Sequence, residues 1–282
     1  MFAPKVVIVR TAEGQRYADF IAKEINLAGF HCGITDIKNL KSYLKEKKYS
    51  PGHTIIHPRT AHPDYVYRVL KDIEKKGYKI INSPETIKLT SDKFKTYVYA
   101  KEKGIPCIET IKVRKEEGAS YAKEKIKQWN QIIVKPLTSQ GQGKFCFRFD
   151  RNNINQIKKI KNIPTPEIII QKFINYQKLN RVIVIGLKAL KKAALWDMPH
   201  KDWKCSVCLN PMIKCYKNPP KALLKFAENV AKKFNGEIFF VDIFTTRKGY
   251  FLNEINTACS LIIHERISRY NISKEIAKHL LK

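Results

Sequence analysis

The first 80 residues alternate short apolar runs with segments that repeat apolar residues at helical spacing. A β-branched run over 5–9 predicts a buried strand, and the pattern over 17–28 predicts a helix that Gly29 ends. The alternation continues with expected strands at 32–37, 54–57 and 79–82 and expected helices at 38–47 and 64–76. Strands that alternate with helices at this spacing indicate a small parallel α/β domain.

Beyond residue 83 the pattern mixes helices with strand pairs. Ser83-Pro84-Glu85 predicts a helix start, because serine caps the first turn and proline suits its φ angle. Another helix is expected from Ser91 to Lys103, ended by Gly104. Strands 168–173 and 181–185 are expected to pair with each other. Strands 238–244 and 250–255 are expected to form a hairpin. The remaining expected elements are helices at 118–128, 219–234 and 274–281 and strands at 109–113, 131–135 and 145–149.

Length and composition favour a protein of two or more associated lobes. The chain has 282 residues, 44% of them apolar, which is enough for a substantial core. No stretch reaches the roughly 20 apolar residues that a membrane span needs. The segment from Met1 to Arg10 lacks a basic-then-apolar leader, so we expect a cytoplasmic location.

The cysteines raise a metal or redox alternative. There are seven, and Cys205-Ser-Val-Cys208 with Cys215 forms the one grouping that could bind zinc. No second pair and no suitably spaced histidine completes four ligands, so ordinary thiols are the favoured interpretation.

The charge is strongly positive. Lysine and arginine total 54 against 25 acids, a formal net charge of +29. Such a field attracts nucleic acids, nucleotides or acidic peptides. The lysines are spread along the chain, which is typical of solvated surfaces. Nucleic-acid binding is the alternative function, but the chain has neither an interleaved aromatic–basic strand signature nor a zinc module.

Acidic residues interrupt two apolar strands near the carboxyl end. Asp242 lies within Phe240-Val-Asp242-Ile-Phe244, and Glu254 and Asn256 lie two residues apart on the returning strand. Alternation places Glu254 and Asn256 on one face, and hairpin pairing brings Asp242 beside them. Two carboxylates and an amide oxygen suit magnesium with phosphate oxygens. The alternative is a satisfied polar patch at a sheet edge.

A glycine-punctuated loop follows a lysine at the end of an apolar strand. The loop Thr138-Ser-Gln-Gly-Gln-Gly143 offers backbone N–H groups that can approach an anion, although it is not a Walker loop. Lys135 precedes it and is placed to hold a phosphate as a point charge. The alternatives are an ordinary turn and a lysine that reaches solvent.

These features occur in one order with several others, and together they carry a resemblance. The series is Asn82-Ser-Pro-Glu-Thr-Ile, Ser91-Asp-Lys93-Phe-Lys-Thr96, Gly104-Ile-Pro106, Ile133-Val-Lys-Pro136, the glycine loop, Gln171-Lys-Phe-Ile174, Arg181-Val-Ile-Val-Ile-Gly186, Val241-Asp-Ile243 and Asn253-Glu-Ile-Asn256. It resembles the ATP-grasp superfamily, and most closely its RimK-type branch of amino-acid ligases. The resemblance extends over nearly the whole chain and is weakest over 10–50.

The resemblance implies an ATP-grasp fold, with α/β and α+β parts. It divides the chain into a pre-ATP-grasp α/β domain (1–83), a small lid subdomain (84–175) and a larger C-terminal subdomain with the metal site (176–282). ATP is expected between the last two. Matched by position, the residues implied to bind ATP are Lys93, Lys135, Ser139, Gln140, Gly141, Gly143, Gln171, Lys172, Phe173 and Ile174.

The same resemblance implies ligands and substrate contacts. Asp242, Glu254 and Asn256 match the metal ligands, for Mg²⁺ or alternatively Mn²⁺. Arg59 resembles the first-lobe arginine near the ligand cleft. The remaining implied residues are Arg181 and Lys204 as catalytic groups and Ser206 as a substrate contact.

The chain also departs from the family pattern. Leu179 stands where an Asp-x-Arg motif has its acid, and Lys204 stands where an arginine is usual. Lysine is a point charge and lacks the planar fork of arginine. Two further departures lie at 207–211 and 257–260. They suggest a divergent acceptor, or a degenerate partner subunit that binds ATP without efficient catalysis.

The implied reaction proceeds through an acyl-phosphate. The acceptor carboxylate attacks the γ-phosphate of ATP, and an amine such as glutamate then displaces phosphate, leaving ADP. Lysines and the metal would spread the developing charge, with Arg181 holding the oxyanion. The acceptor is a small molecule, a peptide or an acidic protein tail, and the resemblance also allows a homo-oligomer.

Overall fold

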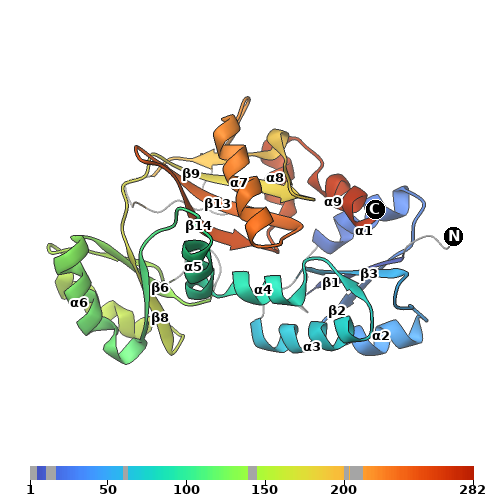
Figure 1. Cartoon of the computed structure of the whole chain (residues 1–282), viewed down its shortest axis with the longest axis horizontal. Helices are drawn as coiled ribbons and strands as arrows, with labels where there is room; N and C mark the ends of the chain where they lie inside the picture. Colours follow the sequence, from blue (N-terminus) through green and yellow to red (C-terminus); the bar gives the residue numbers. More distant parts are fainter. Residues whose placement is uncertain (1–4, 11–16, 60–62, 139–144, 200–202, 204–211) are drawn as a thin grey trace.

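Three β-sheets build the part of the chain that the structure describes, each with its own helices (Figure 1). The computed structural model describes residues 5–10, 17–59, 63–138, 145–199, 203 and 212–282. The first sheet is parallel, with strand order β2-β1-β3-β4. Its strands are β1 (Lys5–Arg10), β2 (Cys32–Asp36), β3 (Thr54–Arg59) and β4 (Lys79–Ile80).

Helices cover both faces of this first sheet, as its continuous apolar strands require. Val7 and Val9 of β1 pack in the core formed with α2 and α3, while Val6 and Ile8 pack in the core formed with α1. The helices are α1 (Tyr17–Leu27), α2 (Leu40–Glu46) and α3 (Pro63–Lys75). The predicted parallel α/β lobe is therefore confirmed.

The second and largest sheet is antiparallel. Its strand order is β12-β11-β9-β13-β14, with β10 paired to β9. The strands are β9 (Lys178–Ile185), β10 (Lys188–Ala189), β11 (Leu195–Asp197), β12 (Lys214–Cys215), β13 (Ile238–Thr246) and β14 (Gly249–Asn256). β13 and β14 form the predicted hairpin.

Alternation along β13 gives the large sheet two different faces. Phe239 and Val241 pack with α7 (Lys221–Lys233). Phe240 points to the opposite face and shares a core with α1, α8 (Leu261–Ser268) and α9 (Ile272–Leu280). Figure 1 shows α1 beside α9, so the first lobe and the large sheet share this core. The sequence pattern did not predict α8, which spans only eight residues.

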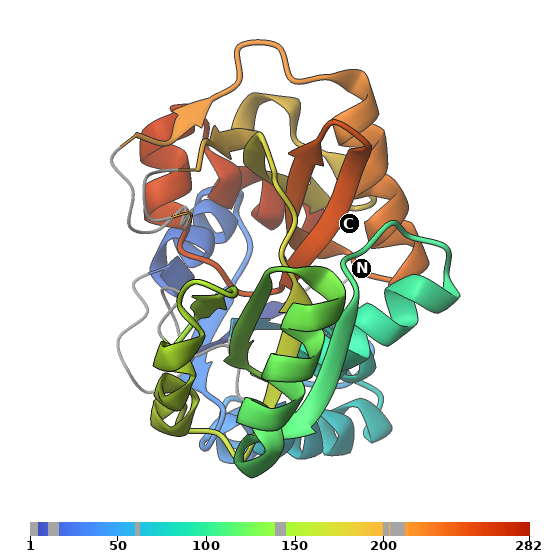
Figure 2. The same ribbon diagram turned by 90° about the vertical axis from the view of Figure 1, so that its left-hand side faces the viewer.

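The third sheet forms a separate lobe with order β5-β8-β6-β7. Its strands are β5 (Thr110–Arg114), β6 (Ile132–Pro136), β7 (Phe147–Phe149) and β8 (Glu167–Lys172). The helix α6 (Gly118–Trp129) and the 3₁₀ helix η2 (Ile154–Asn162) pack against it (Figure 2). Two further 3₁₀ turns are η1 (Lys115–Glu117) and η3 (Lys191–Ala193).

One predicted strand pairing is wrong. The expected strands 168–173 and 181–185 correspond to β8 and β9, which belong to different sheets. β8 is an interior strand paired with both β5 and β6, so neither edge is left for β9. The segment between them instead carries the chain from the third sheet to the large sheet.

Two helices connect the lobes. α4 (Pro84–Ser91) starts at Ser83, whose hydroxyl accepts from the Thr86 N–H at 3.2 Å, as the sequence predicted. α5 (Lys93–Glu102) packs on the large-sheet core through Ala100. Figure 1 shows α4 between the first lobe and the rest. The division at 83/84 and 175/176 stays a prediction.

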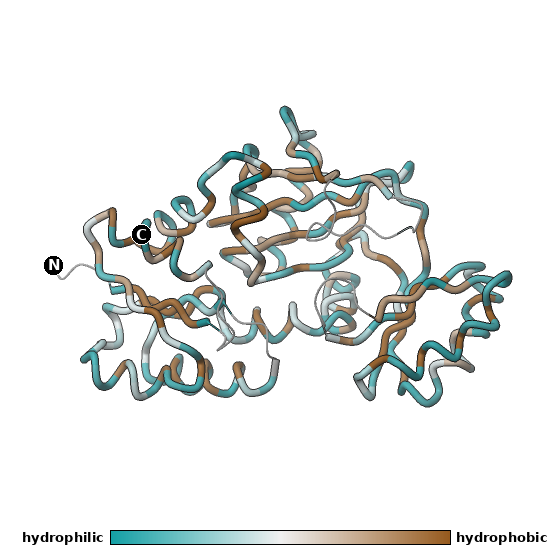
Figure 3. Tube along the Cα trace, turned by 180° about the vertical axis from the view of Figure 1, so that it is seen from behind, coloured by the Kyte–Doolittle hydropathy of each residue, from teal (hydrophilic) through white to brown (hydrophobic). Residues whose placement is uncertain are grey.

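A buried asparagine joins the first lobe to the large sheet. Asn82 donates from Nδ2 to the Ile238 carbonyl at 2.7 Å and accepts from the N–H groups of Glu237 and Ile238 at 2.7 and 2.9 Å. The apolar residues of the chain concentrate on the strands (Figure 3). Among helices of the described residues, none is long and apolar enough to cross a membrane.

Candidate active site

Three charged side chains stand opposite one another on adjacent strands of the large sheet. Arg181 on β9 faces Asp242 on β13, and Asp242 faces Glu254 on β14. Directly opposite residues of antiparallel strands project from the same face. The charged row therefore lies on the face that carries Phe240, toward the first lobe.

Arg181 and Asp242 form a buried bidentate pair. Nε and Nη2 of Arg181 donate to the two carboxylate oxygens of Asp242 at 2.6 and 2.7 Å. Burial raises the pKa of the Asp242 carboxyl, and the guanidinium opposes this by stabilising the charged form. The sequence placed both residues in the site but did not predict that they bind each other.

Glu254 lies among three cations. Its Oε1 is 3.7 Å from the Lys93 ammonium. Burial acts to raise the pKa of Glu254, but the charges of Lys93, Lys135 and Arg181 outweigh it and hold the pKa below its usual value. Glu254 is therefore ionised at neutral pH, as a metal-binding carboxylate must be.

A β-bulge sets which residues of β14 join this face. Asp242 pairs with Glu254, whereas the next residue, Ile243, pairs with Leu252, so Asn253 is an extra residue on β14. The bulge lets Leu252 face the α7 core while Glu254 and Asn256 face the charged row. Sequence alternation predicted the shared face of Glu254 and Asn256 but gave no sign of the bulge.

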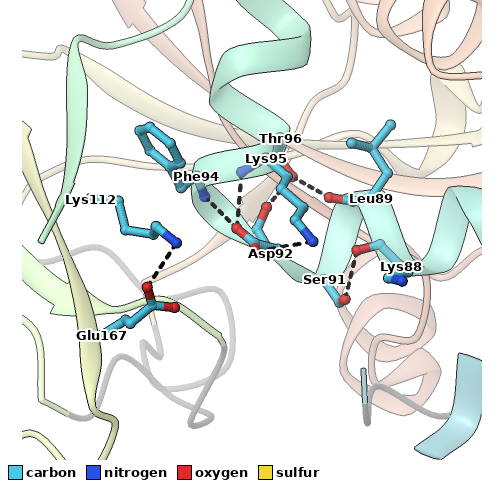
Figure 4. Close-up of polar contacts among 9 residues, drawn as sticks. All are labelled: Lys88, Leu89, Ser91, Asp92, Phe94, Lys95, Thr96, Lys112 and Glu167. Atoms are coloured by element: carbon cyan, nitrogen blue, oxygen red, sulfur yellow. Dashed lines mark hydrogen bonds and ion pairs between the residues drawn. The ribbon is translucent and has the colours of Figure 1, made fainter. Parts of the chain in front are cut away.

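Lys93 is the first residue of α5. Figure 4 shows the contacts of Asp92 and Thr96 that hold the start of this helix in place. Asp92 caps this helix, and one of its oxygens accepts from the N–H groups of Phe94 and Lys95, both at 2.9 Å. Thr96 fastens α5 to α4 by donating to the Leu89 carbonyl at 3.0 Å. A helix amino terminus favours anions, so Lys93 stands where a phosphate would be stabilised twice.

Lys135 approaches the same region from the third sheet. It lines a pocket with Lys93, Gln171 and Glu254. Burial lowers the pKa of Lys135, and the nearby Lys93 charge lowers it further, while Glu254 opposes both. The pocket also includes Thr90, Thr96, Tyr97, Cys107, Ile108, Ile169, Leu252 and Asn253. Lysines and a carboxylate from three elements thus meet in one place.

The glycine loop is described only at its start. Thr138 forms a bridge with Asp92, and the Lys93 N–H donates to the Leu137 carbonyl at 3.1 Å, so the loop leaves from beside α5. The predicted phosphate contacts in this loop lie outside the described residues: Ser139, Gln140, Gly141 and Gly143.

Several polar groups of the expected adenine linker, residues 171–174, already form hydrogen bonds within the protein. Nε2 of Gln171 donates to the Thr110 hydroxyl at 3.0 Å. The N–H groups of Lys172 and Phe173 donate to backbone carbonyls of the third lobe at 2.9 and 3.0 Å. Ile174 follows, half-buried. Because these N–H groups are already used, an adenine base bound at Lys172 and Phe173 would find only their backbone carbonyl oxygens, which accept hydrogen bonds. The role of this segment in adenine binding stays a prediction.

The remaining predicted residues separate into two groups. Lys204 and Ser206 lie outside the described residues, as does the pair Cys205 and Cys208. Arg59 is described and lies at the end of β3, fully buried against the segment that follows β14.

One acidic residue on the charged face, Asp197, was not predicted from the sequence. Asp197 on β11 is 1% exposed and pairs directly with Leu179, the residue that replaces the expected acid. It thus places a carboxylate on the same sheet face from the neighbouring strand. The only signal was an acid closing the apolar run Ala193-Ala-Leu-Trp, because β11 itself was not predicted.

The donor set of the described residues fits a divalent cation. Asp242 and Glu254 are opposed carboxylates, and Asn256 follows Glu254 on the same face. Hard oxygen ligands of this kind suit Mg²⁺. Arg181 uses one lone pair of each Asp242 oxygen, which leaves further lone pairs for a metal.

Comparison with known proteins matches this architecture. Residues 90–280 match the model of the RimK-like ATP-grasp domain. The chain is 29% identical over 205 residues to the glutamate–LysW ligase ArgX of Sulfolobus acidocaldarius, covering 69% of this chain and 71% of the relative. It is 23% identical over 290 residues to the coenzyme gamma-F420-2:alpha-L-glutamate ligase of Methanococcus maripaludis, covering 98% and 99%.

Solved structures show the same fold. A RimK domain ATP-grasp protein from Sphaerobacter thermophilus superposes with a TM-score of 0.73 at 14% identity, covering 99% of this chain and 100% of that one. The ATP-grasp ligase PsnB, solved with Mg and ADP, gives 0.72 at 13% identity, covering 100% and 99%. The predicted ATP-grasp fold is confirmed.

Proposed function

We propose that this chain, which belongs to the RimK-like ATP-grasp family, adds glutamate to a carboxylate acceptor with release of ADP and phosphate. Membership makes it an ATP-dependent ligase that forms carbon–nitrogen bonds with a divalent metal. The choice of glutamate rests on two relatives, which are named a glutamate–LysW ligase and an alpha-L-glutamate ligase.

The observation that carries the proposal is the meeting of Glu254, Lys93 and Lys135 in one pocket beside the Arg181–Asp242 pair. Binding of a polyphosphate requires cationic side chains, and binding of a metal ion requires carboxylates. In this pocket α5 and β6 supply the two lysines, and β14 supplies the carboxylate of Glu254. Lys93 and Lys135 would hold phosphate oxygens as point charges. Bound at Asp242, Glu254 and Asn256, Mg²⁺ would neutralise charge on the phosphates. Mn²⁺ prefers the same oxygen ligands and is expected to substitute.

Arg181 is proposed to act beside the metal ligands. Its bond to Asp242 fixes the plane of the guanidinium on the sheet face, so little reorganisation is needed when negative charge develops there. The acceptor carboxylate would be aligned against the γ-phosphate on this face. Exclusion of water matters at the next step, because an acyl-phosphate otherwise hydrolyses. The third lobe and the glycine loop are proposed to cover the site.

The acceptor is proposed to be acidic. A net charge of +29 favours the approach of a peptide or protein tail with several negative charges over that of a small molecule with a single carboxylate. If so, the rate at low acceptor concentration should fall steeply with added salt. A rate that does not change between low and high salt would favour a small acceptor.

The test is a screen for amine-dependent release of ADP. Purified protein would be mixed with ATP, Mg²⁺, pooled amino acids and pooled carboxylate acceptors, and the products identified by mass spectrometry. We expect ADP, phosphate and a product heavier than the acceptor by one glutamyl residue. Release of AMP and pyrophosphate, or a rate that does not respond to any amine, would overturn the proposal.

A further inference from the structure

The large sheet has a second face, which points away from the charged row. Asn180 precedes Arg181 on β9, so the two side chains project from opposite faces of the sheet. We call the face that carries Asn180 the outer face. α7 packs on this face over Val182 and Val241. Figure 1 shows α7 lying across the sheet, while the turn between β13 and β14 extends past the helix.

Four partly exposed aromatic side chains form a band on the outer face. Trp196 pairs directly with Asn180 across β11 and β9 and therefore shares its face. Tyr216, just after β12, donates from its hydroxyl to Oδ1 of Asn180 at 2.7 Å, and its ring lies 5.9 Å from that of Trp196. Phe226 of α7 and Tyr250 of β14 form a second pair, with ring centroids 6.0 Å apart. Burial, and then the nearby Tyr250, raises the pKa of Tyr216, so the two pairs are neighbours.

Two lysines lie among these rings. The Lys178 ammonium is 4.5 Å from the centroid of Trp196 and 5.6 Å from that of Tyr216. Lys214 pairs directly with Trp196 on β12, and its ammonium is 5.5 Å from the Trp196 ring. No ion pair joins either lysine to an acid in the part of the chain that the structure describes. Both positive charges therefore remain available to an anion.

The surrounding sequence is strongly basic. Residues 178–225 contain ten lysines and Arg181 but only two acids, Asp197 and Asp202. Asp197 belongs to the charged face and not to the outer face. Lys217 and Lys221, both exposed, lie at the two ends of the short link from Tyr216 to α7. The field beside the aromatic band therefore favours a polyanion.

The chemistry of the band favours one kind of polyanion. An acidic peptide would use the lysines but has no need of four aromatic rings. It also could not pair with β9, whose backbone is already bonded to β11 and β13. A nucleic-acid duplex presents its phosphates but keeps its base faces stacked. A single strand offers both phosphates and exposed base faces, and such bases stack on aromatic side chains.

We infer that the outer face binds single-stranded nucleic acid, a function separate from the proposed ligase reaction. Bases stack on Trp196 and Tyr216, while Lys178 and Lys214 turn from the rings to neighbouring phosphates. No single stretch of sequence shows this pattern, because the four rings come from β11, the segment after β12, α7 and β14. Stacking and charge read no base edge, so binding should show little sequence preference.

The test is a fluorescence-anisotropy titration of labelled oligo-U and oligo-dT of about twelve nucleotides, at several salt concentrations and without ATP. Wild type should bind both, with an affinity that falls as salt rises. Trp196→Ala should weaken binding about fivefold to a hundredfold because one stacking surface is lost, whereas Trp196→Phe should keep much of the affinity. Lys178→Met and Lys214→Met should each make the slope of log affinity against log salt shallower by about 0.7.

Lys125→Met is the matched control. Lys125 also lies over a tryptophan, 5.4 Å from the Trp129 ring, but it belongs to α6 of the third lobe. The substitution removes the same charge as Lys178→Met, so the two variants have the same net charge. The salt slope of Lys125→Met should equal that of wild type. Thermal unfolding of each variant checks that its fold is kept.

Several results would overturn the inference. Equal weakening by Lys125→Met and Lys178→Met would show that binding follows net charge alone. A duplex bound as tightly as the single strand, or a folded Trp196→Ala variant with wild-type affinity, would reject stacking on this face. Polyglutamate that displaces the oligonucleotide and depends equally on Trp196 would assign the face to acidic peptides instead. ADP release in the turnover screen without any binding of oligonucleotide would reject this inference and leave the ligase proposal standing.

Discussion

Arg181 and Asp242 bind each other through two parallel hydrogen bonds of 2.6 and 2.7 Å on neighbouring strands. The pair links the group proposed to stabilise the oxyanion to a proposed metal ligand. Such an arrangement holds both side chains in fixed rotamers before substrates arrive, which is the preorganisation that electrostatic catalysis needs.

Removing one partner of this pair should destabilise the protein. Arg181→Met would leave the buried Asp242 carboxylate without its bidentate hydrogen-bond partner, so the free energy of unfolding should fall by about 3–5 kcal/mol. Urea denaturation at pH 7 measures this. Arg181→Met combined with Asp242→Leu should lose less than the sum of the two single losses, because no charge is then left unpaired. Strict additivity would show that the pair is not coupled.

Glu254→Gln should remove metal-dependent turnover while preserving the fold. Glu254 Oε1 lies 3.7 Å from the Lys93 ammonium, and a quarter of the Glu254 side chain is exposed. Loss of this ion pair should therefore lower the free energy of unfolding only slightly. Loss of one charged ligand should lower kcat by about a hundredfold or more. ADP release is measured over a range of Mg²⁺ concentrations.

Glu167→Gln is a suitable control for that measurement. Glu167 forms an exposed ion pair with Lys112 at 2.8 Å on the third sheet (Figure 4), and its loss should leave turnover unchanged. Equal activity in Glu254→Gln and Glu167→Gln would exclude Glu254 as a metal ligand.

Lys135→Met should make the protein more stable and less active. The lowered pKa of Lys135, caused first by burial, shows that the folded state disfavours its charge. Methionine keeps the apolar stem without this cost, so the free energy of unfolding should rise by about 1 kcal/mol. The KM for ATP should rise at least about tenfold if Lys135 holds phosphate. Lys112→Met, on an exposed position of the same lobe, should change neither quantity.

Stability should fall steeply in mild acid because two histidines are buried in their neutral form. Burial lowers the pKa values of His57 and His264 to about 3, against 6.5 for an ordinary histidine. Between pH 6.5 and 3 the unfolded chain binds protons that the folded chain does not. The contribution of the two histidines to the free energy of unfolding is therefore complete above pH 6.5 and is lost as the pH falls. Between pH 7 and 5 the free energy of unfolding should fall by about 4 kcal/mol because of these two histidines.

His264→Phe isolates one half of this effect. Over the same pH range the free energy of unfolding of the variant should fall by about 2 kcal/mol less than that of wild type, since one titrating group is gone. Denaturant unfolding at several pH values gives the comparison. Parallel curves for the two proteins would mean that His264 is not held neutral in the folded state.

Local pattern was sufficient for most elements and for the content of the site. Apolar spacing, caps such as Ser83 and Asp92, and the turn near Gly249 are local signals. They predicted the helices and strands that carry Lys93, Lys135, Asp242 and Glu254. The order of the motifs along the chain was enough for the family. The types of side chain and the order of the motifs along the chain are properties of the sequence alone, and folding does not change them.

Tertiary structure decided which of these groups meet. The separation of β8 from β9 and the pairing of Asp197 with Leu179 depend on which strand edges are free, a property of the whole sheet. The bulge at Asn253 is a register shift between β13 and β14. The contact between Arg59 and Cys259 joins residues 200 positions apart. Burial of that arginine arises only when two lobes close on it, because desolvation is set by neighbours in space and no local pattern encodes it.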